Sequence, residues 1–214
     1  MALDPAVSAG FSIAMELLSL IRIVNSRLGG VGECYAVGGT VRDFLLGEEV
    51  ADFDFALSCT PDQFLLRFPE ADDSFARYGS FGLSLSSRRL DLTCFRRESS
   101  YLDSRHPSKL TFGVSMMEDS VRRDFTVNAL YMDERGDVYD FHGGLFDLKR
   151  RVLRFIGDPA KRINEDPLRI LRAERFQRRL GFCIDSQAKE KIEELRPLLR
   201  RLNPQKAEME RRKG

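Results

Sequence analysis

The feature that most constrains the fold is a pair of adjacent glycines, Gly38 and Gly39. They stand between an apolar run over 34–37, which predicts a buried strand, and a helical spacing of apolar residues over 40–46. A strand, two glycines and a helix N-terminus present backbone N–H groups at close range, and such groups bind anions. The sequence therefore predicts a phosphate-binding turn, to which Arg42 adds a positive charge.

Two aspartates, Asp52 and Asp54, follow in a segment that predicts a second strand. Alternate residues of a strand face the same side, so we expect these carboxylates on one face and Phe53 and Phe55 in the core. Neighbouring carboxylates repel each other unless a cation neutralises them, and Mg²⁺ prefers such oxygen ligands. An Asp-x-Asp pattern alone is more often a solvated strand edge. Beside a glycine turn it describes a metal-dependent nucleoside triphosphate site.

A third carboxylate, Asp91, lies in a further β-rich segment over 88–95. If that segment pairs with the strand of Asp54, Asp91 helps to hold the metal as a third catalytic carboxylate. The alternative is a salt bridge from Asp91 to Arg88 or Arg89, and the residues alone leave the two readings equal.

The rest of the chain predicts an α+β fold. Residues 96–119 are polar and predict a long loop, residues 121–132 predict a helix, and a hairpin is expected around Gly136. After about residue 150 the chain becomes helical, with helices predicted over 166–180 and 186–200. This change of pattern is the best candidate for a domain boundary.

Charge is divided unevenly along the chain. Residues 1–148 hold nine more acidic than basic side chains, whereas residues 149–214 hold ten more basic than acidic ones. The second part is therefore expected either to bind an anionic partner or to be a solvated basic helical surface.

Composition narrows the remaining possibilities. No run of 18 apolar residues occurs, so neither a transmembrane helix nor a membrane partner is expected, and the N-terminus lacks the basic start of a secretory signal. The four cysteines form no Cys-x-x-Cys pair, which favours free thiols in the cytoplasm. Only two histidines are present, which excludes a histidine-rich zinc site.

Three segments, taken in order, resemble the class II tRNA nucleotidyltransferase (CCA-adding enzyme) and bacterial poly(A) polymerase family. They are the glycine turn with its Asp-x-Asp strand (38–54), Arg-Arg-Asp-Phe-Thr-Val-Asn-Ala-Leu (122–130) and Glu-Asp-Pro-Leu-Arg-Ile-Leu-Arg-Ala-Glu-Arg-Phe (165–176). The resemblance extends over most of the chain. It implies a nucleotidyltransferase head with a small mixed β-sheet over 1–154 and a helical neck over 155–214.

The resemblance also implies an activity and its residues. Enzymes of this family transfer a nucleotide from CTP or ATP to the 3′ end of tRNA and release pyrophosphate. The metal aspartates fall on Asp52 and Asp54, and the triphosphate contacts fall on Gly39 and Arg42. Arg123 matches the family's nucleotide-binding arginine in the second segment. Mg²⁺ is the expected cofactor.

The second and third segments supply the remaining nucleotide contacts. Asp124 and Asn128, four residues apart, are expected either to reach the ribose or to make local capping and core hydrogen bonds. Asp166 accepts and Arg169 donates hydrogen bonds, a pattern that suits the base edges of C and A. Asp166 before Pro167 also has the pattern of a helix start. Two further residues of the same row, Arg172 and Arg175, are expected to help hold the nucleotide.

The sequence departs from the family in one respect. Family members continue into body and tail domains that grip tRNA, whereas this chain stops at residue 214. Three alternatives stay open: a missing C-terminal region supplies that grip, a second chain supplies it, or the protein is a natural short form. Addition of CC only, of A only or of poly(A) remains open, as does a catalytically idle RNA- or nucleotide-binding module. Residues 96–107 match the family's mobile loop, which is expected to become ordered on substrate binding.

Overall fold

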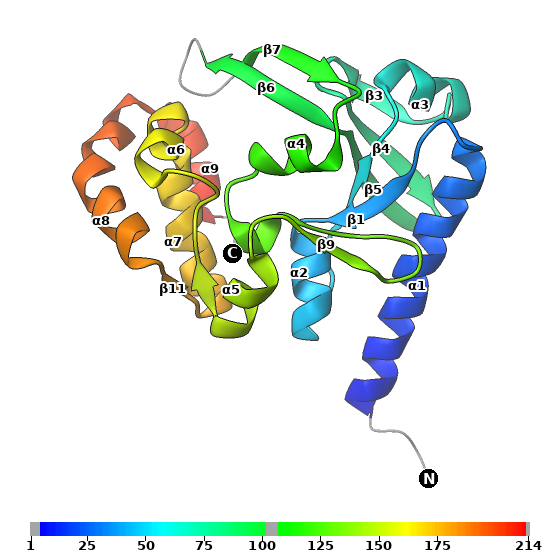
Figure 1. Ribbon diagram of the computed structural model, residues 1–214, viewed down its shortest axis with the longest axis horizontal. Helices are drawn as coiled ribbons and strands as arrows, with labels where there is room; N and C mark the ends of the chain where they lie inside the picture. The colour runs from blue at the N-terminus through cyan, green and yellow to red at the C-terminus, as the bar shows by residue number, and fades with distance from the viewer. Residues whose placement is uncertain (1–4, 102–106, 213–214) are drawn as a thin grey trace. The chain divides into compact units, whose positions relative to one another are not determined.

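The computed structural model describes residues 5–101 and 107–212 (Figure 1). The chain folds into two compact units, each assembled from separate stretches of sequence. Unit 1 contains the residues up to 97 together with 110–120 and 130–141, and unit 2 contains 98–109, 121–129 and the residues from 142 onward.

Unit 1 is built on a seven-stranded mixed sheet with the strand order β3-β4-β5-β2-β1-β8-β9. Only β2 and β5 run parallel within this sheet, and the other described pairs are antiparallel. The strands are β1 (Cys34–Val37), β2 (Phe53–Leu57), β3 (Asp72–Phe75), β4 (Ser80–Leu85), β5 (Arg88–Cys94), β8 (Leu130–Met132) and β9 (Val138–Asp140). The predicted strands over 34–37 and from residue 52 onward are confirmed, and both lie in the middle of the sheet.

Helices and one 3₁₀ turn complete unit 1. They are α1 (Pro5–Leu28), α2 (Gly39–Leu46), α3 (Pro61–Arg67), the 3₁₀ turn η1 (Ala76–Tyr78) and α4 (Met116–Val121). The helix α1 contacts β1, α2 and α3. It buries Leu17, Leu20, Ile21 and Val24, which is the spacing of one apolar helix face. The position of the first site residues is thus fixed by a packed core.

Residues 96–119 are not the irregular loop that their polarity suggested. Two strands, β6 (Arg96–Tyr101) and β7 (Pro107–Phe112), form a separate two-stranded sheet, and α4 follows them. Residues 102–106, within the segment 96–107 that is expected to be mobile, lie outside the described residues.

Unit 2 is mainly helical. Its elements are the 3₁₀ turn η2 (Thr126–Asn128), α5 (Gly144–Arg150), β10 (Val152–Leu153), α6 (Pro159–Glu165), α7 (Leu168–Leu180), β11 (Cys183–Ile184), α8 (Ser186–Leu195), the 3₁₀ turn η3 (Arg196–Arg201) and α9 (Pro204–Arg212). The strands β10 and β11 pair in parallel. Leu168 and Leu171 of α7 pack with Ala207 of α9, and α6 contacts both α7 and α8.

The predicted helix over 121–132 is wrong. Its residues form η2 and then β8, which pairs with both β1 and β9. The hairpin expected around Gly136 is confirmed as β8 and β9. The α+β fold is also confirmed, because unit 1 carries a mixed sheet and helices follow it in the sequence.

Two expectations from composition are met in the described part of the chain. None of its helices combines the length and the hydropathy needed to cross a membrane. All four cysteines are free thiols, and three of them, Cys34, Cys59 and Cys94, are buried.

Candidate active site

The glycine turn has the geometry that its sequence predicted. Gly38 caps α2 with φ 68° and ψ −127°, a conformation that favours glycine, and its N–H donates to the carbonyl of Leu130 at 3.2 Å. The helix begins at Gly39, so the N–H groups of its first turn have no partners within the helix. They form the backbone donor set that a phosphate group requires.

Asp52 and Asp54 lie where β2 begins. Phe53 is 4% and Phe55 1% exposed, so the phenyl rings enter the core as predicted. Asp52 is exposed and Asp54 is half-buried on the other side of the strand. The two carboxylates therefore share the face that water reaches, as the alternation of the strand requires.

A residue that sequence reasoning missed, Thr40, connects the glycine turn to these aspartates. Its hydroxyl donates to the main-chain carbonyl of Asp52 at 2.9 Å and accepts from the main-chain N–H of Asp54 at 2.8 Å. The side chain of Thr40 is buried. One hydroxyl in the first turn of α2 thus fixes the backbone that carries both carboxylates.

Asp91 lies on the strand next to Asp54. In the parallel pair β2–β5 the two aspartates stand in register, and in-register residues of neighbouring strands face the same side. Asp91 also lies 3.7 Å from Nε of Arg89, with both side chains about two-thirds exposed, so the ion pair contributes little. Arg88, the other suggested partner, pairs with Glu16 at 2.7 Å. The role of Asp91 as a third metal carboxylate stays a prediction.

Arg42 occupies an environment that the sequence did not reveal. The guanidinium is buried and donates from Nε to Oδ1 of Asp43 at 2.7 Å and from Nη2 to Oδ2 at 2.8 Å. A Cβ atom on Gly39 would lie 3.5 Å from Nη2 of Arg42, so the guanidinium lies directly beside the glycine turn. Its predicted contact with a phosphate stays a prediction.

The donor chemistry of unit 1 fits a divalent cation. Asp52 and Asp54 supply carboxylate oxygens on a solvent-facing strand surface, and hard cations prefer such ligands. Among the residues that the structure describes, no group of three or more His, Cys, Asp or Glu side chains is placed to hold a metal ion. The two aspartates are therefore the candidate ligands.

The other predicted site residues belong to unit 2. Asp124 and Asn128 are buried, and the amide nitrogen of Asn128 donates to Oδ1 of Asp124 at 3.3 Å. The same oxygen accepts from the N–H of Phe125 at 2.8 Å, while Oδ2 accepts from Nε of Arg172 at 2.7 Å. Asp124 and Asn128 thus make local hydrogen bonds, which is the alternative to a ribose contact that the sequence left open. A ribose contact stays a prediction.

Electrostatics keep Asp124 ionised. Burial raises the pKa of its carboxyl, but the positive charge of Arg172 and the hydrogen bonds from Arg172, Phe125 and Asn128 together lower it below the ordinary value. The pKa of Arg172 is raised, chiefly by the charge of Asp124. The two groups form a charged pair that links the second sequence motif to α7.

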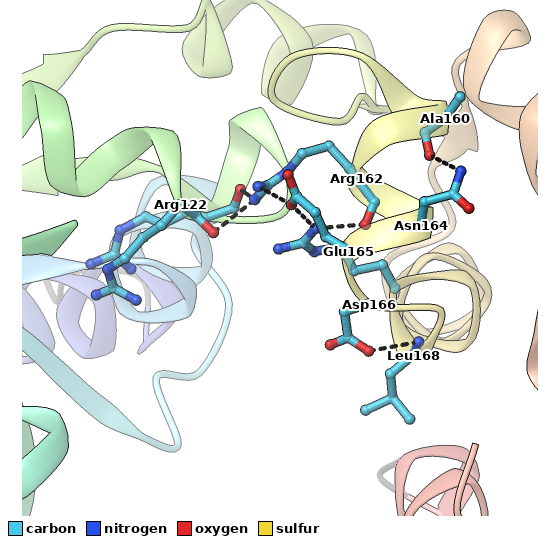
Figure 2. A network of polar contacts seen from close by, with 9 residues as sticks. Arg122, Ala160, Arg162, Asn164, Glu165, Asp166 and Leu168 are labelled. Atoms are coloured by element: carbon cyan, nitrogen blue, oxygen red, sulfur yellow. Dashed lines mark hydrogen bonds and ion pairs between the residues drawn. The ribbon is translucent and has the colours of Figure 1, made fainter. Parts of the chain in front are cut away.

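Asp166 stands at the junction of α6 and α7 (Figure 2), and Arg169 lies in the first turn of α7. Oδ1 of Asp166 accepts from the N–H of Leu168 at 3.0 Å, which is the bond of a helix start. Nη1 of Arg169 donates to the carbonyl of Arg162 at 2.6 Å and to Oε2 of Glu165 at 2.7 Å. Nη1 makes both side-chain hydrogen bonds described for Arg169, so the described part of the chain gives Nη2 and Nε no acceptor. The roles of Asp166 and Arg169 in base reading stay predictions.

Arg175 faces a different partner from the other arginines of α7. Its Nε donates to Oε1 of Glu210 in α9 at 2.9 Å, and both side chains are nearly buried. This ion pair connects α7 and α9, and the predicted nucleotide contact of Arg175 stays untested. The predicted site residues therefore fall into two sets, Gly38 to Asp91 in unit 1 and Arg123 to Arg175 in unit 2.

Known proteins resemble this chain over most of its length. Residues 34–154 match the family described as the Poly A polymerase head domain. A CCA-adding enzyme of Geobacillus sp. (strain WCH70) is 40% identical over 178 residues, which are 83% of this chain and 44% of that protein. A CCA-adding enzyme of Streptococcus gordonii is 42% identical over 171 residues, which are 80% of this chain and 43% of that protein.

Solved structures that resemble this chain are also structures of CCA-adding enzymes. The crystal structure of the Bacillus stearothermophilus CCA-adding enzyme in complex with CTP is 33% identical, with a TM-score of 0.79 over 97% of this chain and 48% of that one. The Thermotoga maritima CCA-adding enzyme complexed with tRNA is 26% identical, with a TM-score of 0.72 over 97% of this chain and 47% of that one.

The chain belongs to the poly(A) polymerase head-domain family. Nucleotidyltransferases of this family generally use a divalent metal ion, which suits the carboxylates of Asp52 and Asp54. The chain spans less than half the length of the CCA-adding enzymes that it matches.

Proposed function

We propose that this chain is a Mg²⁺-dependent nucleotidyltransferase that adds C, A or both from CTP and ATP to the 3′ end of tRNA. The observation that carries the proposal is the link made by Thr40. It ties the glycine turn, which suits a triphosphate, to the backbone of Asp52 and Asp54, which suit a cation. The relatives named CCA-adding enzymes support the same substrates.

In the proposed reaction the 3′-hydroxyl of tRNA attacks the α-phosphorus of the nucleoside triphosphate. A new P–O bond forms, the bond to the β-phosphate breaks, and pyrophosphate leaves. Mg²⁺, when bound, supplies positive charge that stabilises the phosphate oxygens in the transition state. Asp52 and Asp54 would hold this cation, Asp91 beside Asp54 on the neighbouring strand would add a further catalytic carboxylate, and the backbone at Gly38 and Gly39 would bind the triphosphate.

The second set of residues selects the nucleotide. Arg123 contributes to triphosphate binding, and Asp124, Asn128, Arg172 and Arg175 support the bound nucleotide. Asp166 accepts from the exocyclic amino group of C or A, and Arg169 donates to the ring acceptors. Uracil and guanine present the opposite pattern at these positions and are disfavoured.

The organisation and location of the protein complete the proposal. Residues 1–154 act as the catalytic head and residues 155–214 as the neck. Another part of the polypeptide or a second chain supplies the body and tail that grip tRNA. The free thiols suit the reducing cytoplasm, where we place the protein.

The test is direct. The purified chain is incubated with Mg²⁺, tRNA that lacks its 3′ CCA and each labelled nucleoside triphosphate, and product length is read on a denaturing gel. Extension by CTP, by ATP or by both supports the proposal, and the product length separates CCA, CC-only, A-only and poly(A) addition. The control is Asp54→Asn, which keeps the side-chain shape and is expected to abolish extension. A folded wild-type chain that extends no tRNA, even at low salt and at a tRNA concentration high enough to offset the missing grip, refutes transfer and favours a binding module.

A further inference from the structure

A single buried arginine, Arg162, joins two segments of unit 2 that lie about 40 residues apart in the sequence. Its Nη2 donates to the main-chain carbonyl of Arg122 at 2.7 Å and to that of Arg123 at 2.6 Å. Its Nη1 donates to Oε2 of Glu165 at 2.7 Å. Figure 2 shows the Arg162 guanidinium between the backbone at Arg122 and the carboxylate of Glu165. The residue is 8% exposed.

Glu165 extends the connection to the base-reading arginine. The same Oε2 atom also accepts from Nη1 of Arg169 at 2.7 Å, and that Nη1 donates to the main-chain carbonyl of Arg162 at 2.6 Å. One carboxylate thus lies between two guanidinium groups and partly neutralises both. The backbone of Arg123 is connected to the side chain of Arg169 through two intervening residues.

We infer that Arg162 is a positioning residue that sets the placement of Arg123 relative to Asp166 and Arg169. The inference rests on the proposed function, in which Arg123 binds the triphosphate and the other two read the base. Triphosphate binding and base selection then share one rigid support. A nucleotide with the wrong base edge cannot shift to a better fit without moving the backbone that places Arg123.

The chemistry of arginine explains why this residue type occupies the position. A guanidinium is planar and presents donors in a fixed fork, so Arg162 reaches two successive carbonyls and a carboxylate at once. A lysine at 162 has donors on one nitrogen only and cannot span all three acceptors in the same geometry. Arg162→Lys keeps the positive charge but loses the planar arrangement of donors, so this variant separates the effect of the charge from the effect of the geometry.

The competing explanation is that Arg162 only stabilises the fold. Both explanations predict a lower melting temperature when the side chain is removed, because its three part-buried hydrogen bonds are lost. They differ in the nucleotide preference of the protein that remains folded. Loss of stability alone lowers the amount of active protein and leaves the ratio of CTP to UTP use unchanged, whereas loss of positioning changes that ratio.

The experiment compares the wild-type chain with Arg162→Met, Arg162→Lys and a control, Ile192→Val. Ile192 is buried in α8 of the same unit, so the control removes core packing without touching the Arg162 contacts. For each variant the melting temperature is measured first. Then kcat and KM for CTP and UTP on tRNA lacking CCA, and the Kd of each nucleotide with Mg²⁺, are measured well below melting.

We expect Arg162→Met to reduce the preference for CTP over UTP by about tenfold or more, in both kcat/KM and Kd. Arg162→Lys is expected to restore part of the melting temperature and little of the preference. Ile192→Val is expected to melt earlier and to keep the wild-type preference.

Each other result is decisive. A folded Arg162→Met or Arg162→Lys protein with the wild-type preference overturns the inference, and the lysine variant decides the matter if the methionine variant does not fold. A wild-type chain that prefers CTP in binding but transfers nothing refutes the proposed function, while the Kd ratios still test Arg162. A wild-type chain with no nucleotide preference at all overturns both.

Discussion

Replacement of Thr40 by valine tests how the carboxylate strand is held. Valine has nearly the same shape as threonine but no hydroxyl, so Thr40→Val removes the bonds to Asp52 and Asp54 without opening a cavity. The carbonyl of Asp52, an exposed residue, can be solvated by water, whereas the N–H of Asp54 at a half-buried position loses its acceptor. An unsatisfied buried donor costs roughly 1–3 kcal/mol.

A loss of about 2 kcal/mol lowers the melting temperature of a chain of this size by roughly 4–8 °C. We also expect kcat for nucleotide addition to fall by about tenfold, because Asp52 and Asp54 are no longer fixed relative to the glycine turn. Thr40→Ser keeps the hydroxyl and serves as the matched control. Calorimetry gives the melting temperature, and single-nucleotide addition to tRNA gives kcat. A Thr40→Val protein with wild-type melting and wild-type kcat would refute the view that these bonds position the strand.

Three other outcomes are expected. Because the folded-state pKa of Asp124 lies below its unfolded value, its contribution to stability is present above about pH 4 and is lost as the pH falls through the folded pKa. Chemical denaturation between pH 7 and pH 3 should therefore show a smaller acid-dependent loss for Asp124→Asn than for the wild type. Asp166→Ala should cost about 1 kcal/mol through the lost bond to Leu168 and reduce CTP and ATP use by about tenfold to hundredfold relative to UTP and GTP. An altered stability with unchanged nucleotide preference would leave Asp166 as a helix cap only. Binding of the chain to tRNA should weaken steeply as salt rises, because residues 149–214 carry the excess of basic side chains, and a salt-independent affinity would contradict this electrostatic origin.

The local features of the site were predictable because their signals are short in range. Alternation placed Phe53 and Phe55 in the core and the aspartates outside, and the glycine pair marked the start of a helix. The β-rich pattern around Asp91 also indicated a strand, and the in-register position beside Asp54 agrees with the expected neighbouring strand.

The errors came from segments whose structure is decided by distant partners. The apolar run that ends in β8 has no period long enough to separate helix from strand, and its pairing with β1 spans about 95 residues of sequence. The strands β6 and β7 are rich in polar residues and therefore lack the alternation of a half-buried strand. Tertiary pairing determined the structure of both segments.

Thr40 and Arg162 were not predicted from the sequence for the same reason, because their partners are distant in the sequence. Thr40 bonds main-chain atoms 12 and 14 residues away, and Arg162 bonds carbonyls 39 and 40 residues away. Every residue type except proline offers the same main-chain N–H and C=O groups, so the sequence does not show which residue a side chain bonds through its main chain. Such pairs become visible only when the backbone is in place.

The interleaved construction of unit 2 limits how the protein can be dissected. A fragment that ends at residue 154 would retain Asp124 but lose Arg172, the cation that keeps its carboxylate charged. A fragment that begins after residue 141 would retain Phe176 but lose Phe125, whose ring packs edge to face against it at 5.8 Å between centroids. Neither fragment contains both members of the Asp124–Arg172 pair or of the Phe125–Phe176 pair, so we expect split versions of this chain to recover these contacts only if the two fragments reassemble.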